Sequence, residues 1–226
     1  MNICEEIKLL VDHNLTEILA CRNKRSLKSD GSYVTTGDVM VQDLIYQFIQ
    51  HSCPSYHLVS EEQDNSNFAF EQGANYIVVD PIDGTENFTS GLKEWGIGVA
   101  VYSDGVHQQS MIYLPELGEV MLTGMQLTEF ESRIHGLSSS LKLDDLKKIQ
   151  PGFEYRIMGC SMYNLFNVIR GSYAIFENVK GVNTWDILPG VNLALEHNCS
   201  VLVNGDTYHG EFLPPNQRYR IKVQHR

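Results

Sequence analysis

The sequence lacks the features that mark several large classes of protein. It has five cysteines in 226 residues, and none of them belongs to a Cys-x-x-Cys pair. An odd number of scattered cysteines favours free thiols in a reducing cytoplasm over a disulfide framework or a zinc site. The first residues show no basic segment followed by an apolar run, so we expect no signal peptide.

Long apolar runs and clusters of positive charge are missing as well. No segment approaches the roughly 20 apolar residues of a membrane span, and we find no internal repeat or low-complexity tract. Lys and Arg number 17 against 28 Asp and Glu, which gives a net charge of −11. A chain this acidic, without a basic cluster, binds nucleic acid and anionic membranes poorly. We therefore expect neither of them as a partner.

The most informative stretch that is present is NYIVVDPIDGTENF, which starts at residue 75. Its apolar, β-branched residues 77–79 predict a buried strand that ends at Asp80. Pro81 has no backbone donor and is expected to end the hydrogen-bonded ladder of that strand. Asp83-Gly84-Thr85 then predicts a turn, whose glycine can adopt a conformation that other residues avoid, and a short helix after it.

This geometry holds two carboxylates, Asp80 and Asp83, close together. They repel each other when both are ionised, unless a cation lies between them. Oxygen ligands without a nearby Cys or His suit Mg²⁺ or another hard cation. The amides of Gly84 and Thr85, at a turn that enters a helix, offer a site for an anion. A hard cation beside an anion pocket suggests metal-assisted phosphate chemistry.

Two other interpretations of this stretch are weaker. An Asp-Gly pair is often an ordinary hairpin turn, but a turn alone does not explain the second Asp, the Pro and the Thr. Phosphatases of the haloacid dehalogenase type also carry an Asp-Gly-Thr after a buried strand, with two aspartates one residue apart. Here the aspartates are three apart, and Pro81 occupies the position of the nucleophile. Proline cannot act as a nucleophile or as an acid, so that class is excluded.

The stretch from Asp80 to Phe88 instead resembles the signature of the inositol monophosphatase family, Asp-Pro-Ile/Leu-Asp-Gly-Thr-x-Asn-Phe, at every fixed position. Upstream, KSDGSYVTTGD at 28–38 resembles the family's Lys-x-Asp-x-Ser-x-Val-Thr-x-Ala-Asp element, with Gly37 in place of Ala. On its own, Asp38 stands where the N-cap of the next helix is expected. In the family this Asp lies in the active site near a catalytic Thr, and capping leaves it spare lone pairs for that role.

Further elements carry the resemblance along the chain. Ser60-Glu61-Glu62 follows a predicted strand, and the family takes a metal ligand from the first Glu. Trp185-Asp186 stands at the head of a late helix, as in the family's second signature, whose Asp binds metal. A looser match runs from Gly159 to Glu177, with Cys160 in place of the usual Ser.

The resemblance covers about residues 1–205 and implies a mixed α/β fold. The expected layers are α/β/α/β/α, in one domain of residues 1–226 with subdomains at about 1–124 and 125–226. Relatives are longer near 124–152, so we expect the second subdomain to be shortened. After the last predicted strand the chain is expected to end in a Pro-rich, basic tail.

The activity that the resemblance implies is that of a Mg²⁺-dependent phosphomonoesterase for a small polyol, inositol or sugar monophosphate. Two or three metal ions would assist the attack of water, and Asp80 would bridge two of them. The expected metal ligands are Glu61, Asp80, the Ile82 carbonyl, Asp83 and Asp186. Thr85, hydrogen-bonded to Asp38, would prepare the water together with Glu61. The expected substrate-binding residues are Asp83, Gly84, Thr85, Gly159, Ser161 and Glu177.

Glu177 bears on the substrate class. Relatives use a Glu opposite the phosphate to accept hydrogen bonds from substrate hydroxyls, so we expect a polyol rather than a nucleotide bisphosphate. A surface charge just past a strand is the simpler interpretation of this residue. Two alternatives to the main function stay open: a phosphatase for nucleotide 3′,5′-bisphosphate or histidinol phosphate, and a member that binds metal and phosphate without catalysis. Family members are often dimeric, so a homodimer is also expected.

Overall fold

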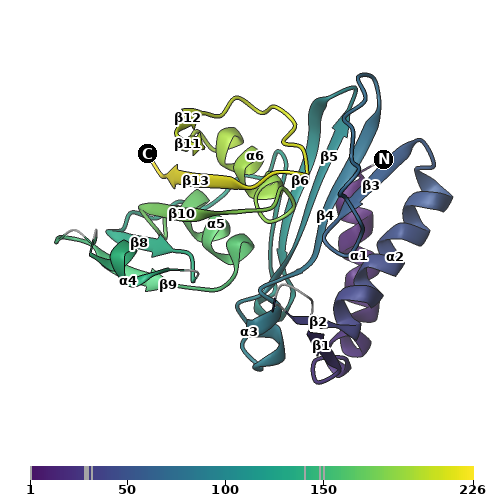
Figure 1. Cartoon of the computed structure of the whole chain (residues 1–226), viewed down its shortest axis with the longest axis horizontal. Helices are drawn as coiled ribbons and strands as arrows, with labels where there is room; N and C mark the ends of the chain where they lie inside the picture. Colours follow the sequence, from purple (N-terminus) through teal and green to yellow (C-terminus); the bar gives the residue numbers. More distant parts are fainter. Residues whose placement is uncertain (1, 28–30, 32, 140, 148, 150) are drawn as a thin grey trace.

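Two β-sheets, with a pair of helices between them, organise the chain (Figure 1). The computed structural model describes residues 2–27, 31, 33–139, 141–147, 149 and 151–226. Within these residues, two long helices cover one face of the first sheet, two shorter helices fill the space between the sheets, and one helical turn lies against the second sheet. The expected α/β/α/β/α order of layers is confirmed.

The first sheet contains, in spatial order, β3 (Tyr56–Ser60), β4 (Asn75–Asp83), β5 (Gly96–Ser103), β6 (Val106–Leu114) and β7 (Glu119–Leu122). Its outer face is covered by α1 (Ile3–Ala20) and α2 (Thr36–Ser52). Along β4, Ile77 and Val79 pack toward these helices, whereas Val78 packs toward the helices between the sheets. A strand buried on both faces has a continuous apolar run, as this one does.

Pro81 does not end β4, contrary to the prediction from the sequence. The strand continues to Asp83, which pairs with Gly96 of β5, and the register shifts between Asp80 and Asp83. Proline removes one donor from the ladder, and the irregular pairing accommodates the loss as a bulge. Both aspartates therefore remain on the strand, where pairing with β5 holds their backbone.

The second sheet contains, in spatial order, β12 (Asp206–Thr207), β11 (Ser200–Val203), β13 (Tyr219–Gln224), β10 (Ile175–Val182), β8 (Ile134–Leu137) and β9 (Glu154–Ile157). Strands β8 and β13 are not predicted from the sequence. Instead of a basic tail, residues 219–224 form an inner strand whose alternate residues Tyr219, Ile221 and Val223 are buried. In β13 the buried residues alternate with Arg and Lys, so the segment has no apolar run that would predict a strand. In the short β8 a glycine interrupts the pattern.

Helices α5 (Ser161–Ile169) and α6 (Leu188–Glu196) lie between the two sheets. Gly98 of β5 allows them to approach, because a Cβ at this position would lie 2.6 Å from Met162 Cε and 3.0 Å from Pro189 Cγ. The remaining elements are short: β1 (Arg25–Leu27), β2 (Tyr33–Thr35), α3 (Thr85–Thr89), η1 (Pro115–Leu117) and α4 (Leu143–Leu146).

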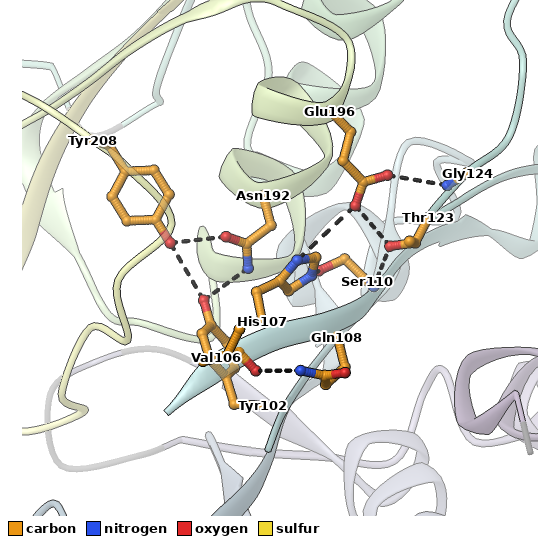
Figure 2. A network of polar contacts seen from close by, with 10 residues as sticks. All are labelled: Tyr102, Val106, His107, Gln108, Ser110, Thr123, Gly124, Asn192, Glu196 and Tyr208. Carbon is orange, nitrogen blue, oxygen red and sulfur yellow. Dashed lines mark hydrogen bonds and ion pairs between the residues drawn. The ribbon is translucent and has the colours of Figure 1, made fainter. Parts of the chain in front are cut away.

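Buried hydrogen bonds connect α6 to the first sheet (Figure 2). Asn192 donates from Nδ2 to the hydroxyl of Tyr102 over 2.8 Å, and its Oδ1 accepts from the hydroxyl of Tyr208 over 2.8 Å. All three side chains are buried. An amide that uses both ends in this way has one preferred orientation, so the contact positions α6 against β5.

A second group of contacts lies at the C-terminal end of α6. Glu196 accepts hydrogen bonds from the hydroxyl of Thr123 over 2.8 Å and from the N–H of Gly124 over 3.0 Å. One of its oxygens lies 4.0 Å from Nδ1 of His107. These bonds join residues on the two sides of the expected subdomain boundary near 124. No helix in the described part of the chain has the length and hydrophobicity that crossing a membrane requires.

Candidate active site

Three aspartates form a compact cluster of carboxylates. Asp80, Asp83 and Asp186 each offer an oxygen atom, and these atoms all lie within 4.8 Å of one another. The first two come from β4, and Asp186 comes from the turn that precedes α6. The N–H of Asn183 donates to Oδ2 of Asp186 over 2.7 Å and so holds the third carboxylate in place.

Glu61 reaches the same place because β3 and β4 are parallel neighbours. Ser60 is paired with Val79 in the register, so the residues that follow, Glu61 and Asp80, emerge at the same edge of the sheet. Glu61 and the three aspartates line one cavity of about 330 Å³. Ile82, Gly84, Thr85 and Gly159, all candidates from the sequence, line it too.

Burial and mutual repulsion raise the pKa values of these carboxylic acids. Burial raises the pKa of Asp80 well above its usual range, and the charges of Glu61 and Asp83 raise it further. The pKa of Asp186 is raised well above its usual range by burial and by Asp83. Burial raises the pKa of Asp83 to about 6, although hydrogen bonds from the Met162 N–H and the Cys160 thiol act in the opposite direction.

The donor set fits Mg²⁺. Both carboxylate oxygens of Asp80 are buried, and neither accepts a hydrogen bond from any residue that the structure describes. A buried carboxylate without partners is costly unless a cation compensates it. Closely spaced oxygen ligands from Asp and Glu are the type that hard cations prefer. The residues present can therefore hold Mg²⁺ at this edge of the sheet.

Asp38 lies in the first turn of α2, but it is not the N-cap that the sequence predicted. The cap is Thr35, whose hydroxyl accepts from the N–H groups of Gly37 over 3.0 Å and of Asp38 over 3.2 Å. Asp38 completes a capping box, and its Oδ2 accepts from the Thr35 N–H over 2.7 Å. Its Oδ1 accepts a hydrogen bond from the hydroxyl of Thr85 over 3.3 Å. One carboxylate thus serves the helix and the candidate site.

Gly84 adopts the conformation that the sequence predicted. Its φ of +84° lies in the left-handed region, and α3 begins directly after it at Thr85. A Cβ on Gly84 would lie 2.9 Å from the Cβ of Cys160. The turn therefore needs glycine for its backbone and for its approach to the residue before α5.

Gly159 and Ser161 border a smaller cavity of about 150 Å³. This cavity shares Asp83 and Asp186 with the larger one, and Gly159 lines both. The two residues therefore lie beside the carboxylate cluster, and their contact with a substrate stays a prediction.

Glu177 does not reach the cluster, contrary to the expectation from the sequence. Side chains alternate along β10, so that Phe176 and Asn178 line the smaller cavity while Glu177 points to the opposite face of the sheet. There its carboxylate lies 3.3 Å from His135 Nε2 and 3.2 Å from Lys222 Nζ. These two neighbours lower the pKa of Glu177. It is a member of a charge cluster on the outer face of the second sheet.

Arg218 is a lining residue of the larger cavity that the sequence prediction missed. It directly precedes β13, in the segment that the sequence assigned to a tail. Tyr219 pairs with Val182 of β10, and this pairing brings Arg218 to the cavity. Pairing between residues so far apart leaves no signal in the local sequence. The other described lining residues that were not predicted are Gly31, Tyr33, Glu86, Val182 and Asn183.

Comparisons with known proteins give a consistent result. The family model described as "Inositol monophosphatase family" matches residues 4–224. An inositol-1-monophosphatase of Mesorhizobium japonicum is 27% identical over 154 residues, which are 66% of this chain and 52% of that protein. The chain thus spans about half the length of this relative. The Nus factor SuhB of Pasteurella multocida is 26% identical over 190 residues, which are 73% of this chain and 69% of that protein.

A solved structure shares the fold over nearly the whole chain. An IMPase/NADP phosphatase in complex with Mg²⁺ and phosphate aligns with a TM-score of 0.81 at 18% sequence identity. The alignment covers 98% of this chain and 88% of that one.

Proposed function

Because this chain belongs to the inositol monophosphatase family, we propose that it is a Mg²⁺-dependent phosphomonoesterase. The proposed substrate is the monophosphate of a small polyol, inositol or sugar. The observation that carries the proposal is the environment of Asp80, whose buried oxygens accept no hydrogen bond within the described residues. This carboxylate lines a cavity with Glu61, Asp83 and Asp186. These four carboxylates are suited to a cation that carries a phosphate group.

The groups proposed to hold the cation are Glu61, Asp80, the Ile82 carbonyl, Asp83 and Asp186. Bound Mg²⁺ supplies positive charge for the phosphate oxygens and acidifies water. Hydrogen bonds within the chain orient two of these carboxylates. Met162 and Cys160 donate to Oδ2 of Asp83, and Asn183 donates to Oδ2 of Asp186. Each aspartate is thereby oriented and keeps its Oδ1 for ligation.

Thr85 is proposed to orient the attacking water. Its hydroxyl proton is directed to Asp38 Oδ1 at 3.3 Å or to the Ile82 carbonyl at 3.1 Å. The hydroxyl oxygen therefore keeps lone pairs that can accept a hydrogen bond from water in the cavity. Burial raises the pKa of Asp38, against hydrogen bonds from Thr35 that lower it. A carboxylate with a raised pKa is a better proton acceptor at neutral pH.

The contact between Thr85 and Asp38 favours catalysis over mere binding of metal and phosphate. Neither residue is needed to hold a cation that the other carboxylates already surround. The volume of the cavity bears on which substrate of the family is hydrolysed. At about 330 Å³ it supports a small ester over a dinucleotide.

Release of inorganic phosphate tests the proposal. The purified protein would be assayed with inositol, sugar, histidinol and nucleotide phosphates, in Mg²⁺ and in excess EDTA. We expect Mg²⁺-dependent turnover of at least one small ester and none with EDTA. Asp80→Asn is the matched control, since it keeps the shape of the side chain and removes its charge. A folded protein that binds Mg²⁺ and hydrolyses nothing would support the binding-only alternative instead.

We also propose a cytoplasmic location, a single domain and a homodimer, each for a different reason. All five cysteines are free thiols, which fits a reducing cytoplasm. Hydrogen bonds that join α6 to β5 and to Thr123, the residue after β7, support one domain with two subdomains over two separate domains. The homodimer is proposed from family membership and is checked by light scattering.

A further inference from the structure

We propose that Arg218 selects substrates whose leaving group carries its own anion, either a carboxylate or a second phosphate. The inference rests on the proposed phosphatase activity and adds a substrate class to it. Among the described residues that line the 330 Å³ cavity, Arg218 is the one with a positive charge, and it shares the lining with Glu61, Glu86 and the three aspartates.

The second sheet is shaped so that Arg218 reaches the cavity. The register between β10 and β13 shifts between Asn178 and Val182. Asn178 Oδ1 accepts from the N–H groups of Lys180 and Gly181, both over 3.2 Å, and so stabilises this irregular turn. Gly181 has a φ of +90°, and a Cβ on it would lie 3.3 Å from the Cβ of Arg218. The turn thus leaves room for the arginine beside the residues that lead to Asp186.

The backbone before Arg218 is anchored at two points. The hydroxyl of Thr184 donates to the carbonyl of Leu213 over 2.6 Å, and the hydroxyl of Tyr219 donates to the carbonyl of Pro214 over 2.9 Å. Thr184 and Tyr219 are buried. The segment that carries Arg218 is therefore tied to the turn that carries Asp186.

The guanidinium of Arg218 is available for a ligand. It forms no ion pair or hydrogen bond with a side chain in the described ranges, whereas Arg170 and Arg133 each have a carboxylate within 3.6 Å. Its charge acts on Asp186, where it opposes the rise in the pKa. A guanidinium presents five donors in a planar fork, which matches a carboxylate or a phosphate group in a bidentate contact.

The position of Arg218 assigns it to the leaving group and not to the transferred phosphate. The transferred phosphate belongs beside the cation at Asp80, Asp83 and Asp186. Asp80 and Asp83 line the cavity from β4 of the first sheet, whereas Arg218 lines it from the residue before β13 of the second sheet, so we assign Arg218 to the rest of the ester. Glu177, which would have favoured a neutral polyol, points to the other face of the sheet. The charge that meets the leaving group is therefore positive.

A matched pair of esters tests this inference. Glycerol 2-phosphate and 2-phosphoglycerate differ in one group, a hydroxymethyl in the first and a carboxylate in the second. We expect Arg218→Gln to lower kcat/KM for 2-phosphoglycerate about tenfold or more, the effect of one lost charge-assisted hydrogen bond. The same variant should change kcat/KM for glycerol 2-phosphate by less than about twofold. Arg218→Lys should retain part of the preference for 2-phosphoglycerate.

Arg220→Gln is the control variant. Arg220 is also exposed and lies two residues away, but it lines a different cavity together with Glu177. Both esters should be hydrolysed by this variant as by the unmodified protein. A second pair, fructose 1-phosphate and fructose 1,6-bisphosphate, distinguishes the two anions. An Arg218 effect confined to one pair identifies the carboxylate or the second phosphate as its ligand.

Several results would overturn the inference. An equal loss on both esters would assign Arg218 to the transferred phosphate or to the fold, and the thermal unfolding midpoint separates these two. Unchanged kinetics for 2-phosphoglycerate would show that Arg218 makes no contact. If neither ester is hydrolysed, calorimetric titration of both esters in Mg²⁺ still decides the Arg218 contact, whereas the phosphatase proposal is decided separately by the wider panel of phosphate esters. The contact would be rejected if 2-phosphoglycerate did not bind, or if it bound to the unmodified protein and to Arg218→Gln with equal affinity.

Discussion

The hydroxyl of Thr85 donates to the carboxylate of Asp38 over 3.3 Å, across 47 residues of sequence. Thr85 begins α3 directly after the strand with Asp80 and Asp83, and Asp38 belongs to the first turn of α2. The contact therefore joins the outer helix layer to the edge of the first sheet. It also places a hydroxyl oxygen with spare lone pairs at the wall of the cavity that the carboxylates line.

Replacing Thr85 by Ala should lower kcat and leave Mg²⁺ affinity nearly unchanged. A positioned group that helps transfer a proton contributes about 10²–10⁴-fold, and no carboxylate is altered by this change. Thr85→Ser keeps the hydroxyl and should retain most of the rate. Steady-state kinetics and calorimetric Mg²⁺ titration give the two quantities. A loss that appeared only as weaker Mg²⁺ binding would contradict the orienting role.

Replacing Asp80 by Asn should stabilise the protein in EDTA. The substitution removes one charge from a buried cluster in which burial, Glu61 and Asp83 all disfavour ionisation. Mg²⁺ at about 100 times its Kd should stabilise the unmodified protein by about 2.7 kcal/mol and the variant by much less. Thermal or urea unfolding in EDTA and in Mg²⁺ measures both effects. Equal stabilisation of the two proteins by Mg²⁺ would remove Asp80 from the metal site.

His107 should make the protein less stable as the pH falls below about 6.5. Burial lowers its pKa from the ordinary value of 6.5, against Glu196, which raises it. The folded state therefore binds the proton less tightly than the unfolded state, and stability is full above the unfolded pKa and is lost below it. Urea unfolding of the protein and of His107→Gln at pH 7.5 and 5.5 checks the sign. The variant should lose less stability on acidification, and an equal or larger loss would refute the assignment.

Gly84→Ala should destabilise the protein and reduce its activity. The left-handed conformation costs a non-glycine residue about 1–2 kcal/mol, and the new Cβ would lie 2.9 Å from the Cβ of Cys160. Gly91→Ala is the matched control, since Gly91 also has a positive φ, of +78°, and no atom lies within 4 Å of its added Cβ. The difference between the two variants isolates the close contact of the new Cβ with Cys160 and its neighbour Gly159. Equal destabilisation and equal activity would show that this contact is unimportant.

Local sequence determined much of the first sheet and of the edge that carries the candidate site. The apolar run at 77–79, the glycine at 84 and the helix that begins at Thr85 all occur as predicted. Strand alternation, left-handed glycine and helix initiation depend on neighbouring residues, so a short stretch contains the information. The signature from Asp80 to Phe88 also indicated the family to which the chain belongs.

Tertiary structure alone decided which of two charged residues, Glu177 or Arg218, lines the cavity. From the sequence, Glu177 and Arg218 are a carboxylate at a strand end and a basic residue in a tail. The side of the sheet that each faces depends on the pairing of β10 with β8 and β13, strands that lie far apart in the sequence. A shift of one residue in such a register reverses every side chain. Glu177 therefore lies on the outer face beside Lys222, and Arg218 lies at the cavity.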